Sequence, residues 1–158
     1  MGIDSTRISL RRRFDPAVSK ALLKGLIDYN EQKTGLRSYR YVQLAARDRK
    51  GRVIGALEGG IWYGWLFIKL LWVDEASRHG GIGRRLIARA EAEAVRQGCV
   101  GAWLDTFSFQ ARPFYERLGY RLFGTIDGYP PGHKRFFLQK RLKAPARSPA
   151  RGRRKPGL

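Results

Sequence analysis

Residues 78–85 read Arg-His-Gly-Gly-Ile-Gly-Arg-Arg, and they stand between an apolar stretch and a segment with the spacing of an amphipathic helix. A helix begins with backbone N–H groups that have no partner within the helix, and its dipole adds partial positive charge there. The glycines let a ligand approach the backbone, and the arginines add full positive charge. The stretch therefore predicts a loop and helix start that bind phosphate groups.

Two well-known phosphate-binding loops do not fit this stretch. It lacks the Lys-Ser/Thr ending of a P-loop, and it does not match the Gly-x-Gly-x-x-Gly fingerprint of dinucleotide-binding folds. The pattern that remains is Arg-x-x-Gly-x-Gly, formed by Arg78, Gly81 and Gly83. A second motif follows in residues 111–120, which read Ala-Arg-Pro-Phe-Tyr-Glu-Arg-Leu-Gly-Tyr.

Together the two motifs resemble the acetyl-CoA pyrophosphate loop and the Ala-x-x-Phe-Tyr-x-x-x-Gly-Phe segment of the GNAT N-acetyltransferases. The resemblance covers about residues 5–142. It implies an α/β, GNAT-like acyl-CoA N-acyltransferase fold, in which two central strands splay apart around the pantetheine arm of acetyl-CoA. It also implies transfer of the acetyl group from acetyl-CoA to a primary amine in a ternary complex.

Hydrophobic periodicity independently predicts a mixed α/β sheet. The predicted strands span residues 6–13, 39–46, 53–57, 66–73, 100–105, 120–126 and 133–142. The predicted helices start at Pro16, Ile82 and Arg112 and end near Gly35, Gly98 and Leu118. The crossover from 66–73 through a helix to 100–105 predicts a parallel pair at the centre of a mostly antiparallel sheet.

The chain has 158 residues, enough for one domain, which we place at residues 1–142. Its net charge is +19, and residues 143–158 carry six positive charges with no carboxylate, which predicts a disordered basic tail. The tail reads either as a solvated extension or as an arm that touches RNA, a membrane or an acidic partner. Its lack of aromatic residues favours the first interpretation.

Cysteine content and hydropathy limit which cross-links, metal sites and membrane segments the sequence can form. The single cysteine, Cys99, excludes an internal disulfide and a multi-cysteine metal site. The sequence has no apolar leader and no apolar stretch of membrane-spanning length, so it predicts a cytoplasmic protein with no membrane partner. It leaves open whether the protein is a monomer or a homodimer.

The resemblance assigns roles to individual residues. Tyr115 matches the tyrosine that protonates the departing CoA thiolate, and the oxyanion donor is a backbone N–H near Trp72 and Val73. The residues expected to bind acetyl-CoA are Trp72, Val73, Arg78, His79, Gly80, Gly81, Ile82, Gly83, Arg84, Arg85 and Ser108. Ser108 stands where the family commonly has an asparagine, and a hydroxyl reaches less far than an amide.

The general base has two candidates, Glu58 and Asp105, both near strand ends. Five carboxylates are expected near the mouth of the cleft, namely Glu58, Asp74, Glu75, Asp105 and Asp127. An acidic mouth favours a small cationic amine, such as a metabolite or an amino-bearing antibiotic, as the acceptor. Two alternatives stay open: the amine of a protein or aminoacyl-RNA as acceptor, and a non-catalytic module that binds nucleic acid through its basic surface.

Overall fold

The computed structural model describes residues 6–143, which separate into two compact units on either side of the peptide between Arg37 and Ser38. The first unit contains α1, Pro16–Thr34. The Asp15 carboxylate accepts a hydrogen bond from the Ala17 N–H at 3.0 Å and so caps the helix. The predicted first helix is therefore confirmed. The predicted disordered tail lies outside the described residues, apart from residue 143.

The predicted strand over residues 6–13 is wrong. These residues have no regular secondary structure, and Ile8 and Leu10 are exposed. An extended segment becomes a stable strand only when a neighbour satisfies its backbone hydrogen bonds, and residues 6–37 contain no such neighbour. Alternation of apolar and polar residues alone does not supply that partner.

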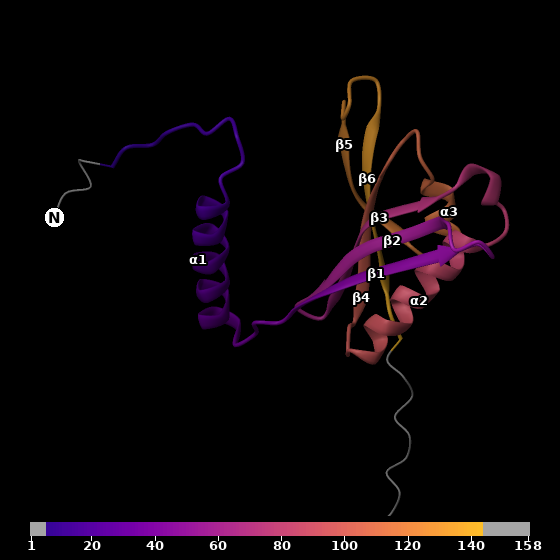
Figure 1. Ribbon diagram of the computed structural model, residues 1–158, viewed down its shortest axis with the longest axis horizontal. Helices are drawn as coiled ribbons and strands as arrows, with labels where there is room; N and C mark the ends of the chain where they lie inside the picture. Colours follow the sequence, from indigo (N-terminus) through magenta and orange to yellow (C-terminus); the bar gives the residue numbers. More distant parts are fainter. Residues whose placement is uncertain (1–5, 144–158) are drawn as a thin grey trace, which may run out of the picture. The chain divides into compact units, whose positions relative to one another are not determined.

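The second unit is built on a six-stranded mixed sheet with the order β1-β2-β3-β4-β6-β5 (Figure 1). Its strands are β1 (Tyr39–Arg47), β2 (Val53–Trp62), β3 (Trp65–Val73), β4 (Gly101–Phe107), β5 (Arg121–Asp127) and β6 (Lys134–Arg141). Its helical elements are the short 3-10 turn η1 (Glu75–Ser77), α2 (Ile82–Arg96) and α3 (Arg112–Arg117). The predicted mixed α/β class is confirmed.

The second strand is longer than the sequence predicts. Gly59 and Gly60 were expected to interrupt it after residue 57, but both lie inside β2. A side chain at Gly59 would collide with the Phe67 carbonyl, so glycine is needed for this close approach. The register between β2 and β3 also shifts at this point, because β3 carries an extra residue, Lys69.

The parallel pair at the centre of the sheet separates part-way along its length. β3 and β4 pair from Trp65 with Gly101 to Ile68 with Leu104. Beyond those pairs, residues 69–73 of β3 and 105–107 of β4 continue without pairing each other. The splayed strands implied by the resemblance are therefore present, and they open the sheet at the carboxyl ends of its two central strands.

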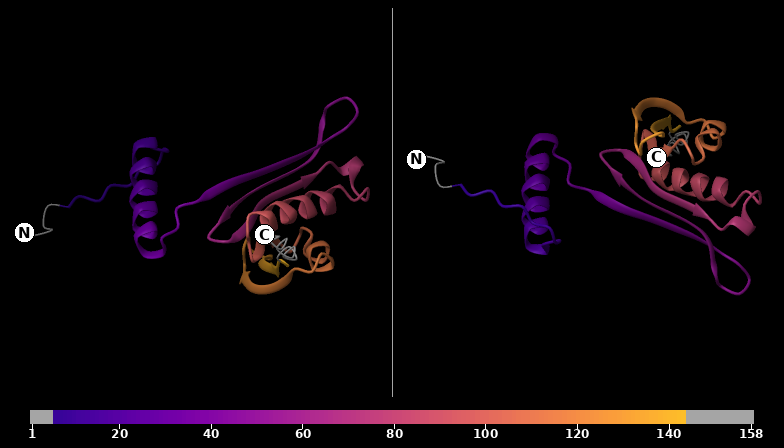
Figure 2. Two further views of the ribbon diagram at one scale, coloured as in Figure 1. Left: turned by 90° about the horizontal axis from the view of Figure 1, so that it is seen from below. Right: turned by 90° about the horizontal axis from the view of Figure 1, so that it is seen from above.

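Helix α2 packs on β1, β2 and β3 and covers one face of this part of the sheet (Figure 2). Its buried residues, Leu86, Ile87, Ala90 and Ala94, recur at helical spacing. They pack with buried strand residues such as Leu57, Leu66 and Leu104 in one hydrophobic core. This packing fixes the start of α2 just beyond the end of β3.

A buried polar cluster ties α2 to the last strands. Glu91 of α2 accepts hydrogen bonds from the Tyr120 hydroxyl at 2.8 Å and from Lys140 Nζ of β6 at 2.8 Å. These contacts hold α2 against the part of the sheet that follows α3. Over residues 6–143, no helix is both long and apolar enough to cross a bilayer.

Candidate active site

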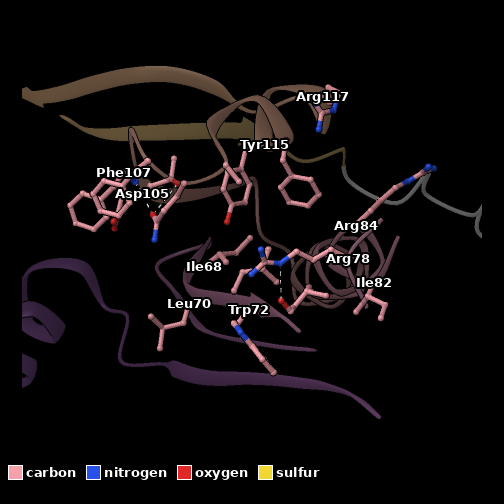
Figure 3. Close-up of a pocket in the computed structure, with 18 of the residues that line it drawn as sticks. Ile68, Leu70, Trp72, Arg78, Ile82, Arg84, Asp105, Phe107, Tyr115 and Arg117 are labelled. Atoms are coloured by element: carbon pink, nitrogen blue, oxygen red, sulfur yellow. Dashed lines mark hydrogen bonds between the residues drawn. The ribbon is translucent and has the colours of Figure 1, made fainter. Parts of the chain in front are cut away.

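A cavity of about 900 Å³ opens where β3 and β4 separate. Its lining comes from β3, the loop before α2, the start of α2, β4, α3 and β6. Asp105 and Phe107 lie at one end, Arg84 and Arg117 at the other, and Tyr115 between them (Figure 3). The volume is typical of sites for small molecules and cofactors. Residues far apart in the sequence thus share one elongated site.

The N-terminus of α2 forms one end of the cavity. Gly81 caps the helix with φ 75°, a left-handed conformation that favours glycine. A Cβ at Gly83 would lie 3.3 Å from the Phe114 ring, so glycine also allows α3 to approach closely. The lining includes eight of the residues predicted to bind the cofactor: Trp72, Val73, Arg78, His79, Gly81, Ile82, Gly83 and Arg84.

The other predicted cofactor residues lie outside that lining. Gly80 is in the turn before the helix, and Arg85 is exposed on α2. Ser108 Oγ accepts a hydrogen bond from the Lys134 N–H at 3.1 Å and lies 3.3 Å from His133 Nδ1. The Ser108 hydroxyl therefore already has a hydrogen-bond partner in β6, the neighbour of β4 in the sheet.

Positive charge is concentrated at the α2 end. Arg78 Nε donates to the Val73 carbonyl at 3.2 Å, which folds its guanidinium over the end of β3. Arg84 reaches the same end from α2, and Arg117 reaches it from α3. Arg117 was missed at the sequence level, although it lies within the second motif. Three guanidinium groups beside a helix N-terminus form a strong site for anions.

The backbone of β3 presents amides to the gap. The Asp74 N–H donates to the Ile54 carbonyl of the neighbouring chain segment at 2.9 Å. Successive residues of a strand point their N–H groups to opposite sides. The N–H group of Trp72 therefore points toward β2, whereas the N–H groups of Leu71 and Val73 point into the gap between β3 and β4. The N–H groups of Leu71 and Val73 are thus the donors available at the predicted oxyanion position.

Tyr115 lies on α3 with its hydroxyl directed into the cavity (Figure 3). It is buried, with an exposed fraction of 9%. Burial raises the pKa of Tyr115 to about 12, and the negative charge of Asp105 adds to the effect. The phenol is therefore fully protonated at neutral pH and can act only as a proton donor there.

The two candidate bases have different surroundings. Asp105 lies on β4 among the lining residues and forms an ion pair with Arg135 of β6. Glu58 lies on β2 outside the cavity lining, 3.6 Å from Lys69 Nζ, and as a hydrogen-bond acceptor it raises the pKa of Tyr41. The structure thus brings Asp105, and not Glu58, into the cavity with Tyr115.

The acidic mouth expected from five carboxylates does not assemble. Asp105 is the member of that set that lines the described cavity. Asp127 is exposed and pairs with Lys134 at 2.6 Å, and Asp74 and Glu75 lie at the turn η1. Strand ends that look equivalent in the sequence meet different edges of the sheet. The described residues also contain no cluster of three or more side chains suited to hold a metal ion.

Gln110 is a further lining residue that the sequence analysis missed. Its Oε1 accepts hydrogen bonds from the Phe107 N–H at 2.8 Å and from the Thr106 hydroxyl at 3.1 Å. These bonds close the turn that follows β4 and fix the end of the strand that carries Asp105. Arg135 was missed as well, because a single arginine in a strand carries no motif.

Comparisons with known proteins agree with this geometry. The sequence profile of the Acetyltransferase (GNAT) family matches residues 9–120. Blasticidin-S acetyltransferase of Streptomyces morookaense is 47% identical over 103 residues, which cover 65% of this chain and 75% of that protein. An acetyltransferase of Agrobacterium fabrum is 36% identical over 128 residues, which cover 81% of this chain and 93% of that protein.

Solved structures show the same architecture. The crystal structure of a proposed acetyltransferase from Agrobacterium tumefaciens superposes with a TM-score of 0.80 and 34% identity. The match covers 86% of this chain and 99% of that one. The six-stranded sheet with its splayed central pair is thus the fold of known acetyltransferases.

Proposed function

Because the chain belongs to the acetyltransferase (GNAT) family, we propose that it transfers the acetyl group of acetyl-CoA to a primary amine of a small molecule. The observation that carries this proposal is the single elongated cavity, which joins an anion-binding helix N-terminus to a buried phenol and a carboxylate. The diphosphate would lie at Gly81–Arg84, and the pantetheine arm would follow the gap beside Leu71 and Val73.

The acceptor we propose is a small cationic amine, with an amino-bearing antibiotic as the leading class. The similarity to blasticidin-S acetyltransferase supports this class. Each cation at the acceptor end is matched by a carboxylate, since Lys69 lies beside Glu58 and Arg135 beside Asp105. These two pairings lower the positive charge that an ammonium group meets beside Asp105.

The first step of the proposed reaction is loss of a proton from the acceptor ammonium. A free alkylamine has a pKa near ~10, so most of it is protonated at neutral pH. Asp105, in the cavity, accepts this proton directly or through one water molecule. The neutral nitrogen then attacks the thioester carbonyl carbon, and the developing oxyanion accepts hydrogen bonds from the N–H groups of Leu71 or Val73.

The second step breaks the carbon–sulfur bond. The nitrogen of the tetrahedral intermediate releases its second proton to solvent, and the CoA thiolate leaves and takes the phenolic proton of Tyr115. The phenolate then regains a proton from solvent, and Asp105 gives up to solvent the proton that it accepted in the first step. A free thiol has a pKa of about 8.5, but the burial that raises the pKa of Tyr115 also raises that of a thiol in the same cavity. Because burial raises both pKa values, the raised pKa of Tyr115 does not by itself prevent proton transfer between the two groups.

The test is a steady-state assay of purified protein with acetyl-CoA, blasticidin S and a panel of aliphatic amines, amino sugars and anionic amines. Mass spectrometry of the product and release of free CoA measure the transfer. We expect acetylation of one or more cationic small molecules. No transfer to any amine, together with no acetyl-CoA-induced rise in melting temperature, would refute the proposed function. A preference for anionic acceptors would refute the proposed acceptor class.

A further inference from the structure

Asp105 is held at the acceptor end of the cavity by Arg135, and the contact is one-sided. Arg135 Nε donates to Asp105 Oδ1 at 2.8 Å, and a terminal nitrogen of the same guanidinium lies 2.6 Å from that same oxygen. The side chain of Asp105 is only 13% exposed and that of Arg135 only 26%. Both contacts fall on Oδ1, and among the described residues no hydrogen bond goes to the second carboxylate oxygen.

Arg135 is itself fixed by its neighbours. Its Nη1 donates to the Tyr129 hydroxyl at 3.1 Å. The guanidinium carbon lies 5.2 Å from the ring centres of Phe107 and Tyr129 and 5.7 Å from that of Phe137. Contacts of this kind hold the planar guanidinium in one orientation. Arg135 therefore acts as a rigid support and is not free to swing toward a substrate.

We propose that Arg135 is a positioning residue for acetyl transfer, which fixes the Asp105 carboxylate so that its second oxygen meets the acceptor amine. The proposal rests on the function proposed above. Reacting groups must be held in near-contact geometry, and a displacement of about 1 Å can lower a rate by about 10²-fold. Without Arg135, the Asp105 carboxylate would lose the contacts that fix its orientation.

A purely structural role explains the pair less well. β4 and β6 already pair along the whole of β4, from Gly101 with Arg141 to Phe107 with Arg135. The two strands therefore do not need the ion pair to stay together, and a buried ion pair adds little net stability in general. The Asp105–Arg135 pair lies where β3 and β4 separate, in the same cavity as the hydroxyl of Tyr115. This location fits a role in the reaction.

The test is a double-mutant cycle with Arg135→Met, Asp105→Asn and the combined variant. The readouts are kcat and KM for acetyl-CoA and for the acceptor that the wild-type protein uses best. Each single variant should lose about 10²-fold in kcat/KM for the acceptor, with KM for acetyl-CoA unchanged. The combined variant should be no slower than the slower single variant, because Arg135 acts through Asp105.

Two further variants make the result decisive. Arg135→Lys should recover part of the activity, since a lysine keeps the charge but cannot reproduce the two-point contact. Lys134→Met is the control, because Lys134 pairs with the exposed Asp127 on the same hairpin, and its kinetics should match the wild type. If Arg135→Met does not fold, the cycle is run with Arg135→Lys.

Three outcomes would overturn the inference: wild-type kinetics of Arg135→Met, wild-type kinetics of Asp105→Asn, or losses that multiply in the combined variant. Each of them leaves a wild-type enzyme that still acetylates its acceptor. Absence of transfer by the wild type would instead contradict the proposed function itself. The two failures are therefore distinguishable in one set of assays.

Discussion

Tyr115 is the residue whose surroundings specify its chemistry most clearly. Its hydroxyl points into the cavity, and burial raises its pKa to about 12, so it holds its proton at neutral pH. In the proposed reaction this proton goes to the leaving thiolate. The same tyrosine also packs against Phe114 and Tyr120 in the core. An experiment must therefore separate the loss of its hydroxyl from the loss of its packing.

Replacing Tyr115 with phenylalanine should lower kcat by about 10²- to 10⁴-fold, the range typical of a missing general acid. The ring and its packing remain, so acetyl-CoA should bind as before. Steady-state kinetics and a thermal-shift titration with acetyl-CoA measure the two effects. Tyr120→Phe is the matched control, since its hydroxyl is bonded to Glu91, and it should lose stability but not kcat. Unchanged kcat in Tyr115→Phe would exclude the acid role.

Tyr115 also links stability to high pH. Its pKa is higher in the folded protein than the 10.0 of an exposed tyrosine, so folding favours the protonated phenol. This contribution is present below pH 10 and disappears as the pH rises toward about 12. A rise in pKa of that size corresponds to about 3 kcal/mol. Urea unfolding at pH 8 and pH 11.5 should show a larger stability loss for wild type than for Tyr115→Phe. Equal losses would contradict the pKa shift.

At the scale of elements, α2 and the loop before it carry the expected cofactor contacts. Arg84 reaches the cavity from the first turn of the helix, beside the N-cap Gly81. Charge-assisted contacts to phosphate weaken with salt. We therefore expect Arg84, in the first turn of α2, to contact a phosphate of acetyl-CoA.

Replacing Arg84 with glutamine should raise KM for acetyl-CoA about 10-fold, the effect of losing roughly 1.4 kcal/mol of phosphate contact, with kcat little changed. The dependence of this KM on salt should also weaken. Initial rates at low and high NaCl concentration check both expectations. Arg89→Gln is the control, because Arg89 is exposed on the following turn of α2. Equal effects of the two variants would indicate long-range charge alone and contradict a direct contact.

The first helix and the central crossover could be predicted from the sequence because their signals are local. Asp15 and Pro16 mark a helix start, and the apolar run before residue 78 with the helix after it predicts a parallel crossover. The length of β2 could not be predicted, since Gly59 is needed there for the close approach of β3, which the local sequence does not show. The strand expected at residues 6–13 failed for a related reason, because pairing depends on a partner distant in sequence.

The part of the candidate site that could be predicted is the part that lies in sequence motifs. Arg78, Gly81 and Tyr115 belong to sequence patterns, and the structure places all three in the cavity. The choice between the candidate bases depended on strand order, which brings β6 beside β4 and so pairs Asp105 with Arg135. No local pattern carries that information.

At the scale of the whole molecule, the high positive charge raises the question of a macromolecular acceptor. The described cavity is lined by residues between Ile68 and Arg135. The acceptor proposed above is a small amine, which fits within such a cavity. The net charge of +19 would then concern solubility and nonspecific contacts more than catalysis.

Deleting residues 144–158 should leave kcat/KM for a small amine within about two-fold of the full chain, since no described contact of the cavity is removed. Parallel assays of both proteins at several salt concentrations provide the comparison. A large loss of activity on deletion, or a strong preference for protein or aminoacyl-RNA amines by the full chain, would favour the macromolecular alternative.

The separation of β3 from β4 has a mechanical consequence. Only four residue pairs of backbone ladder join the β1-β2-β3 half of the described sheet to the β4-β6-β5 half, and side-chain packing and the contacts of Glu91 supply the other links. A molecule bound in the gap between residues 69–73 of β3 and 105–107 of β4 contacts both halves where their strands do not pair, and so links them. We therefore expect acetyl-CoA to make the two strands less mobile at this end and to bind before the amine.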